Sequence, residues 1–237
     1  MDFNFYMPVR LYSGEGCLRR GGEQLRSLGR RCLVVTGAHA AKACGALDDA
    51  LSALEEAGVA ATVFPGIGEN PLLSQCQAAA FAAEACRAEF LLGVGGGSVM
   101  DATKAAAWLA ANNITDGYKL FTGLRHRALP FALAGTTAGT GSEVTNLSII
   151  ARTRLGTKLG LVSPAMYADH AVLIPQLLEG LPFGVFAASS IDALVHAVES
   201  SPSPRATPYT KLFGYKAIEM ILHGYQRLVS EGREALH

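Results

Sequence analysis

The sequence predicts an α/β fold, in which a parallel sheet lies between two layers of helices and is followed by the start of an all-helical domain. Over the first half of the chain, short apolar runs typical of strands alternate with Ala- and Leu-rich runs typical of helices. The centres of these strands are apolar throughout, as expected for strands buried on both faces. After Pro182 the pattern becomes helical.

The predicted elements follow the order of a parallel sheet with crossover helices. Predicted strands cover residues 31–37, 61–66, 90–97 and 129–136, and the helices between them cover 40–57, 73–88 and 98–111. Three further short strands, VTNLSIIAR, KLGLVS and AVLIP, lie between about 144 and 175. Two helices, 183–200 and 209–235, are separated by the Ser/Pro-rich stretch SSPSPRATP. We therefore expect an α/β domain over 1–180 and an incomplete helical domain over 181–237.

Composition excludes several classes of protein. Twenty basic and twenty acidic residues among 237 leave no net charge, which argues against a nucleic-acid groove or a polybasic membrane patch. The five cysteines, Cys17, Cys32, Cys44, Cys76 and Cys86, show no CxxC spacing and are typical of reduced thiols. The N-terminus lacks the pattern of a signal peptide, and no apolar run is long enough to span a membrane. We expect a cytoplasmic protein.

The stretch GVGGGSVMDATK, residues 93–104, is the strongest sign of phosphate binding. Its glycines end a strand and Ser98 opens a helix, so a pyrophosphate could approach the backbone and the positive end of the helix. The alternative is a tight turn with a serine cap. Asp101 and Lys104 lie on the first helical turns, where they could equally form a solvated pair.

Two further segments carry polar groups in unusual density. GTTAGTGSEVT, residues 135–145, offers several hydroxyls and backbone N–H groups directly after a strand, although a solvated turn would look similar. IDALVHAVES, residues 191–200, places Asp192 and His196 four positions apart, on one face of a helix. That spacing suits two ligands of a divalent metal ion, whereas a catalytic site usually takes three. The alternative is a helix-terminal aspartate and a core histidine.

These motifs, taken in order with Lys158 in GTKLG, resemble the iron-containing (group III) alcohol dehydrogenase family. RCLVVTGAHAAKACGALDD and the ENP at 69–71 are also similar to its N-terminal half. The resemblance implies a Rossmann-like nucleotide-binding domain followed by an all-helical domain, with the active site in the cleft between them. It also implies hydride transfer between a primary alcohol or aldehyde and a nicotinamide, assisted by a metal that acts as a Lewis acid.

The resemblance assigns roles residue by residue. It implies that Gly96, Gly97 and Ser98 hold the pyrophosphate, that Asp101, Thr136, Thr137, Thr140 and Lys158 line the rest of the dinucleotide site, that Asn70 lies close to the cofactor, and that Asp192 and His196 are the first two metal ligands. The cofactors implied are NAD or NADP, with Fe²⁺ or Zn²⁺. The implied substrate is a small alcohol or aldehyde, and relatives are commonly dimers or larger.

The chain departs from the family pattern at its end. The family places two further histidine ligands later in the helical domain, and neither His223 nor His237 is expected to replace them. We therefore expect a member truncated in its helical domain, with an incomplete metal site. Alternatives are an NAD(P)-binding remnant without catalysis, a relative of glycerol dehydrogenase and dehydroquinate synthase, and two chains that share metal ligands across an interface.

The end of the first predicted strand bears on the choice of cofactor. NAD-preferring relatives tend to carry an aspartate there, whereas this chain has Gly37, followed by Ala38 and His39. An acidic group would repel a 2′-phosphate, so its absence favours NADP slightly, and His39 and Lys42 could attract the phosphate. The alternative is that Gly37 merely closes the strand.

Overall fold

The computed structural model of the chain describes residues 2–121 and 127–232. Two compact units are distinguished by their internal contacts. The sheet unit comprises Met7–Thr137 and Gly141–Leu178, and the helical unit comprises Met1–Tyr6, Ala138–Thr140 and Glu179–His237. The sequence prediction places the boundary near residue 180 and assigns neither short segment to the helical part. His237 lies outside the described residues.

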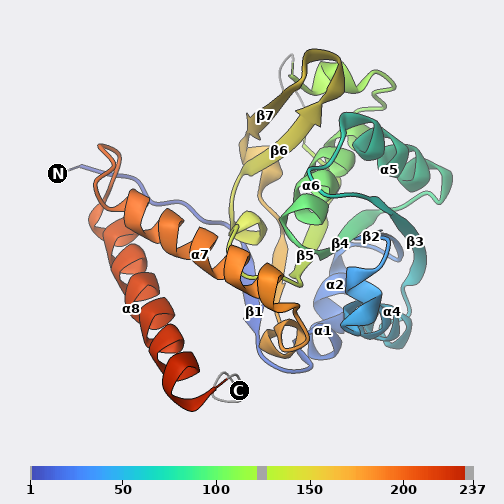
Figure 1. Ribbon diagram of the computed structural model, residues 1–237. Helices are drawn as coiled ribbons and strands as arrows, with labels where there is room; N and C mark the ends of the chain where they lie inside the picture. The colour runs from blue at the N-terminus through green and yellow to red at the C-terminus, as the bar shows by residue number, and fades with distance from the viewer. Residues whose placement is uncertain (1, 122–126, 233–237) are drawn as a thin grey trace. The chain divides into compact units, whose positions relative to one another are not determined.

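The sheet unit is built on a six-stranded sheet in which every neighbouring pair is parallel (Figure 1). The strand order is β1-β8-β5-β4-β2-β3. This topology confirms the predicted α/β class with a Rossmann-like sheet. The strands are β1 (Arg10–Ser13), β2 (Arg31–Gly37), β3 (Ala60–Ile67), β4 (Phe90–Gly95), β5 (Phe131–Gly135) and β8 (His170–Leu173).

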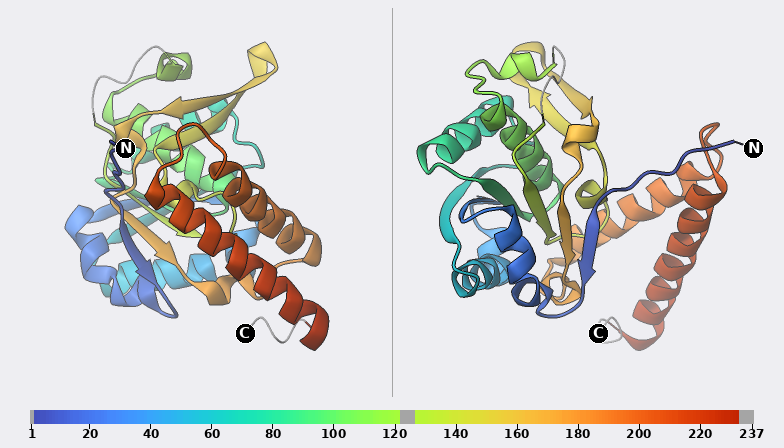
Figure 2. Two further views of the ribbon diagram at one scale, coloured as in Figure 1. Left: turned by 90° about the vertical axis from the view of Figure 1, so that its left-hand side faces the viewer. Right: turned by 180° about the vertical axis from the view of Figure 1, so that it is seen from behind.

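Helices cover both faces of this sheet because its central strands are apolar on both sides (Figure 2). On β2, Leu33 and Val35 pack into one core cluster, and Cys32 and Val34 pack into the other. The first cluster includes α5 (Leu73–Ala85) and α6 (Gly97–Ala111). The second includes α1 (Cys17–Arg20), α2 (Gly22–Leu28), α3 (Ala40–Ala43) and α4 (Ala46–Glu56).

The predicted helix over 40–57 was wrong as a single element. The chain breaks it between α3 and α4, where Gly45 adopts a left-handed conformation with φ of 81°. Glycine reaches this region without a steric cost, so the helix ends and restarts there. The strand β1 was not predicted. It lies at one edge of the sheet, paired with β8.

A separate two-stranded antiparallel sheet lies beside α6 (Figure 2). It consists of β6 (Leu147–Arg152) and β7 (Thr157–Val162), and the pairing places Ala151 opposite Lys158. The main chain of β6 also meets the segment that follows β3, because the Ala151 N–H donates to the Pro71 carbonyl at 2.9 Å. Both strands were predicted, but their separation from the main sheet was not.

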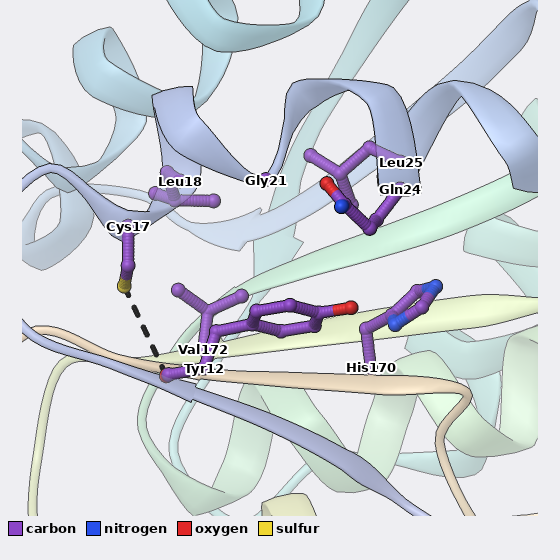
Figure 3. Close-up of a pocket in the computed structure, with 8 residues that line it drawn as sticks. All are labelled: Tyr12, Cys17, Leu18, Gly21, Gln24, Leu25, His170 and Val172. Atoms are coloured by element: carbon purple, nitrogen blue, oxygen red, sulfur yellow. Dashed lines mark hydrogen bonds between the residues drawn. The ribbon is translucent and has the colours of Figure 1, made fainter.

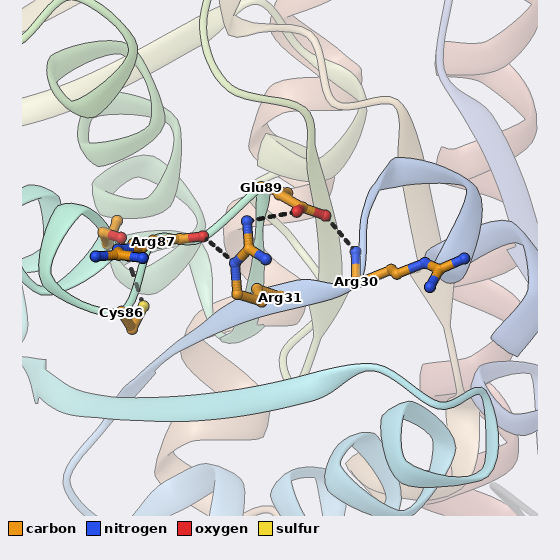
Figure 4. Close-up of polar contacts among 6 residues, drawn as sticks. Arg30, Arg31, Cys86, Arg87 and Glu89 are labelled. Atoms are coloured by element: carbon orange, nitrogen blue, oxygen red, sulfur yellow. Dashed lines mark hydrogen bonds and ion pairs between the residues drawn. The ribbon is translucent and has the colours of Figure 1, made fainter.

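Charged side chains join β2 and β4 at their amino ends (Figure 4). The Arg31 guanidinium lies 2.6 Å from a Glu89 carboxylate oxygen, and its Nε donates to the Arg87 carbonyl at 2.7 Å. The other Glu89 oxygen accepts the Arg30 backbone N–H. Because the strands are parallel, all their carboxyl ends lie at the opposite end of the sheet. The predicted cofactor residues come just after these strand ends.

The helical unit contains α7 (Phe183–Ser200) and α8 (Pro208–Glu231). Thr207 caps α8 by accepting the Thr210 N–H, and Pro208 stands at the first helical position. The two helices pack together, with the hydroxyls of Ser190 and Tyr225 2.6 Å apart. Among the residues described, no helix combines the length and apolar character needed to cross a membrane.

Candidate functional site

The candidate cofactor residues of the sheet unit follow the carboxyl ends of its parallel strands. Gly96 and Gly97 come directly after β4, Thr136 and Thr137 directly after β5, and Asn70 shortly after β3. Open parallel sheets usually bind their ligands at the carboxyl ends of the strands. The strand pairing brings β4 and β5 into register up to Gly95 and Gly135, so the two loops start side by side.

The glycine turn leads from β4 into the N-terminus of the 15-residue helix α6. The Gly96 carbonyl accepts the N–H groups of Val99 and Met100, at 3.0 and 3.1 Å. The N–H groups of Gly97 and Ser98 lie in the first turn, where a helix provides no acceptor of its own. A Cβ on Gly96 would lie 3.0 Å from the Thr137 hydroxyl oxygen, so glycine keeps this approach open. The turn can therefore accept an anion.

The two threonines after β5 differ in exposure. Thr136 is buried, and its N–H donates to the Gly95 carbonyl at 3.1 Å, which fixes the loop to β4. Thr137 is half-buried, next to Gly96. Thr140 belongs to the helical unit, where the adjacent Gly139 packs so closely on the Ser189 carbonyl that a Cβ would clash.

Asn70 and Lys158 are exposed but bonded to each other. Lys158 Nζ donates to Asn70 Oδ1 at 2.6 Å, and the Asn70 N–H donates to the Ser98 hydroxyl at 3.1 Å. Asn70 has a φ of 51°, in the left-handed region that asparagine tolerates better than most residues. Lys158 is therefore not an isolated surface lysine, because these two hydrogen bonds connect it through Asn70 to Ser98 in the first turn of α6.

The alternative of a solvated Asp101–Lys104 pair was wrong. Lys104 is fully buried, and burial lowers its pKa to about 8. The Asp101 carboxylate accepts the Ser142 hydroxyl at 2.6 Å and the Ile149 N–H at 2.9 Å, while burial raises its pKa. Burial also raises the pKa of Glu143, whose charge interacts with that of Lys104. The residues 142–149 cover this side of α6, which the helix sequence alone does not reveal.

The end of β2 carries no acidic side chain. Gly37 is half-buried, and a Cβ there would lie 3.2 Å from the Ile67 carbonyl and 4.0 Å from Val99. This close packing is compatible with the alternative that the glycine closes the strand. His39 precedes α3 and is exposed, as is Lys42.

The candidate metal ligands lie on α7 in the helical unit. His196 Nε2 lies 3.6 Å from Asp192 Oδ1, and both side chains are about half exposed or more, at 61% and 48%. The alternative of a core histidine was therefore wrong. The donor types suit Fe²⁺ or Zn²⁺. Within the described part of the chain, however, no group of three or more His, Cys, Asp or Glu side chains converges. His223 is exposed on α8.

A small pocket lies between the edge strand β1, its neighbour β8 and the helices α1 and α2 (Figure 3). His170, Tyr12, Cys17 and Gln24 are among its lining residues. His170 is 3% exposed, and its ring centroid lies 5.6 Å from that of Tyr12. Neither His170 Nδ1 nor Gln24 Oε1 has a hydrogen-bond partner among the described residues. No predicted site residue lies here.

Comparison with known proteins gives consistent matches across both units. A model of the family described as "Iron-containing alcohol dehydrogenase" matches residues 8–175, and one described as "Fe-containing alcohol dehydrogenase family, C-terminal" matches residues 186–236. Sulfoacetaldehyde reductase of Bilophila wadsworthia is 33% identical over 237 residues, covering 99% of this chain and 61% of that protein. 4-Hydroxybutyrate dehydrogenase of Clostridium kluyveri is 43% identical over 148 residues, covering 61% of this chain and 38% of that protein.

Solved structures agree. An iron-containing alcohol dehydrogenase from Thermotoga maritima has a TM-score of 0.91 at 33% identity, covering 99% of this chain and 65% of its own. Sulfoacetaldehyde reductase from Bifidobacterium kashiwanohense, crystallised in complex with NAD⁺, has a TM-score of 0.89 at 28% identity, covering 100% and 63%. The chain thus spans less than two thirds of the length of these relatives. Both parts of the family's sequence pattern and its fold are present, and the chain belongs to the iron-containing alcohol dehydrogenase family.

Proposed function

We propose that this chain binds NAD(H) or NADP(H) and takes part in hydride transfer between a small alcohol and the corresponding aldehyde. The observation that carries the proposal is the glycine turn at the start of α6, joined through the Ser98 hydroxyl to Asn70 and Lys158. It combines backbone N–H donors, a helix N-terminus and an ammonium group, which suit a pyrophosphate.

The proposal gives each residue a part in holding the cofactor. Gly96, Gly97 and Ser98 bind the pyrophosphate, while Asn70, Asp101, Thr136, Thr137, Thr140 and Lys158 form the remaining cofactor site, directly or through a neighbour. In the sheet unit, Lys158 supplies a positive charge that would attract the pyrophosphate of the cofactor. The cofactor supplies the hydride chemistry, and the protein orients it.

We propose a slight preference for NADP(H) over NAD(H). Gly37 leaves the end of β2 without the carboxylate that would repel a 2′-phosphate, and the exposed His39 and Lys42 follow it. Binding of NAD⁺ by the Bifidobacterium relative concerns that protein, so the two cofactors need to be compared directly on this chain.

For the metal, we propose that Asp192 and His196 provide two ligands for Fe²⁺ or Zn²⁺. When bound in such a site, the metal would act as a Lewis acid that favours the alkoxide form of the alcohol. Two protein donors fit the chemistry of the ion but do not complete a catalytic site, which usually takes three.

The incomplete donor set favours a second candidate function, which is cofactor binding without turnover. The described residues offer Asp192 and His196 and no third His, Cys, Asp or Glu beside them. A homo-oligomer in which two chains share ligands would restore catalysis. The two candidate functions share the cofactor site and differ only in activity.

Cofactor binding can be measured without activity, because the sole tryptophan, Trp108, lies on α6. Quenching of its fluorescence by energy transfer to NADH or NADPH should report binding. Gly96→Ala places a methyl group where the anion approaches and should weaken binding at least about tenfold. Gly180→Ala is the matched control, because a Cβ there meets nothing within 4 Å. If neither NADH nor NADPH quenches the Trp108 fluorescence of the wild-type protein, the proposal is refuted.

Turnover then separates the two candidate functions. The protein is loaded anaerobically with Fe²⁺ or with Zn²⁺, and aldehyde-dependent oxidation of NADPH is followed by absorbance. The aldehydes should include a simple alkanal, sulfoacetaldehyde and the aldehyde of 4-hydroxybutyrate, because relatives are named for the last two. Turnover above the metal-free rate supports the dehydrogenase. Binding without turnover for any aldehyde supports the non-catalytic function.

A further inference from the structure

Asp101 makes three hydrogen bonds, two to β6 and one to Ser142 in the segment that leads into β6. Its carboxylate accepts the Ile149 N–H at 2.9 Å and the Ser142 hydroxyl at 2.6 Å, one at each oxygen. Its backbone carbonyl accepts the hydroxyl of Ser148, a buried residue of β6, at 2.8 Å. Both carboxylate oxygens are thus engaged by the protein, although the family resemblance places Asp101 in the dinucleotide site.

Lys104 makes a second link one turn further along α6. Its ammonium donates to the carbonyls of Thr145, at 2.9 Å, and Leu147, at 2.7 Å, and it lies 3.4 Å from the Thr145 hydroxyl oxygen. The side chain is fully buried. A cofactor at the protein surface therefore cannot touch this ammonium, and the contacts that Lys104 makes are to the chain leading into β6.

The two-stranded sheet continues this connection to the candidate cofactor site. In the β6–β7 pairing, Ala151 lies opposite Lys158. Lys158 donates to the Asn70 side chain, and the Asn70 N–H donates to the Ser98 hydroxyl in the first turn of α6. The contacts form a closed ring that leaves α6 at Asp101 and returns to it at Ser98.

We propose that Asp101 and Lys104 are positioning residues that hold β6 and β7 against α6 and thereby fix Lys158 and Asn70 for cofactor binding. This role rests on the proposed function, and it replaces direct contact between Asp101 and the cofactor. Loss of either side chain removes hydrogen-bond partners from residues 142–149, which lead into and form part of β6, so the two-stranded sheet would shift or loosen. Lys158 would then lose its defined place beside Asn70.

A double-mutant cycle tests whether Lys104 acts through Lys158. The variants are Lys104→Met, Lys158→Ala and their combination, and the measurement is cofactor affinity from quenching of Trp108 fluorescence. We expect Lys104→Met to weaken binding at least about fivefold in the wild-type background and less than about twofold in Lys158→Ala, since coupled residues are non-additive. Equal losses in the two backgrounds would overturn this role while leaving cofactor binding intact. Wild-type protein that binds neither cofactor overturns both proposals.

Hydrogen exchange provides a readout that is independent of the cofactor. Lys104→Met should raise amide exchange in Leu147–Val162 and leave β2 and β4 protected. Ser148→Ala is a milder variant that removes a single hydrogen bond to Asp101. It should also raise amide exchange in Leu147–Val162, and it can be used if Lys104→Met does not fold. Thr103→Val is the matched control, because this buried hydroxyl bonds only within α6, to the Val99 carbonyl. Unchanged exchange of β6 and β7 in Ser148→Ala and Lys104→Met would overturn the proposal.

Discussion

The Lys158 ammonium lies 2.6 Å from the side-chain oxygen of Asn70, 88 positions away in the sequence. The two residues come from different structural contexts, since Lys158 lies on β7 and Asn70 follows β3. The Asn70 backbone adopts the left-handed region, at φ of 51°. A side-chain acceptor and an unusual backbone conformation thus occur at the same position.

Asn70→Ala should weaken cofactor binding at least about fivefold and lower the free energy of unfolding by about 1 kcal/mol. Alanine removes the acceptor for Lys158. It also destabilises the folded protein, because asparagine tolerates the left-handed backbone conformation better than alanine does. Tryptophan quenching gives the affinity, and urea denaturation gives the stability.

Asn113→Ala separates these two effects. Asn113 is exposed at the end of α6 and has nearly the same φ, 50°. Its variant should lose similar stability and keep wild-type cofactor affinity. Asn70→Asp keeps an oxygen for Lys158 and tolerates this backbone conformation, so it should keep wild-type stability, while its negative charge beside the proposed pyrophosphate should weaken cofactor binding. Equal affinities for Asn70→Ala and the wild type would contradict the assigned role.

Gly37→Asp should shift the cofactor preference from NADPH towards NADH. The new carboxylate would stand at the end of β2, where it would repel a 2′-phosphate and could accept ribose hydroxyls. We expect the ratio of NADPH to NADH affinity to fall at least about tenfold, measured by parallel titrations.

Gly37→Ala is the control for this experiment, because any Cβ there comes within 3.2 Å of the Ile67 carbonyl. That variant should weaken the binding of NADPH and of NADH to the same extent, so the ratio of the two affinities should stay unchanged. An unchanged ratio in Gly37→Asp would mean that the 2′-position of the cofactor lies elsewhere.

Much of the fold can be predicted from local pattern alone. Strands buried on both faces, such as β4 and β5, read as continuous apolar runs, and the glycines after β4 mark the turn into α6. The i, i+4 spacing likewise predicts that Asp192 and His196 lie close together. These features depend on residues that are close in the sequence.

The burial of Asp101 and Lys104 could not be predicted in the same way. Their partners, from Ser142 to Ile149, lie 41 to 48 positions further along the chain. Nothing in the pattern of α6 shows that another segment covers this face. The one usable sign was a lysine and an aspartate inside a helix that is otherwise almost entirely apolar.

His196→Ala should weaken Zn²⁺ binding at least about tenfold, as measured by equilibrium dialysis with metal analysis. The substitution removes one of two converging donors, and a single carboxylate holds the ion poorly. His223→Ala is a matched control in the same unit, because His223 is also exposed but lies on α8. Equal binding by His196→Ala and the wild type would show that the metal, if bound, is held elsewhere.

His170→Leu should make the protein less sensitive to acid. Burial lowers the pKa of His170 from its ordinary value of 6.5, so the unfolded chain takes up a proton there at a higher pH than the folded protein does. The free energy of unfolding therefore falls as the pH drops below about 6.5, by at most about 1.4 kcal/mol per pH unit from this group. Urea denaturation at pH 7, 6 and 5 should show a smaller loss in His170→Leu than in the wild type or in the exposed control His223→Leu. The same loss in all three proteins would mean that His170 takes up its proton equally well in the folded state.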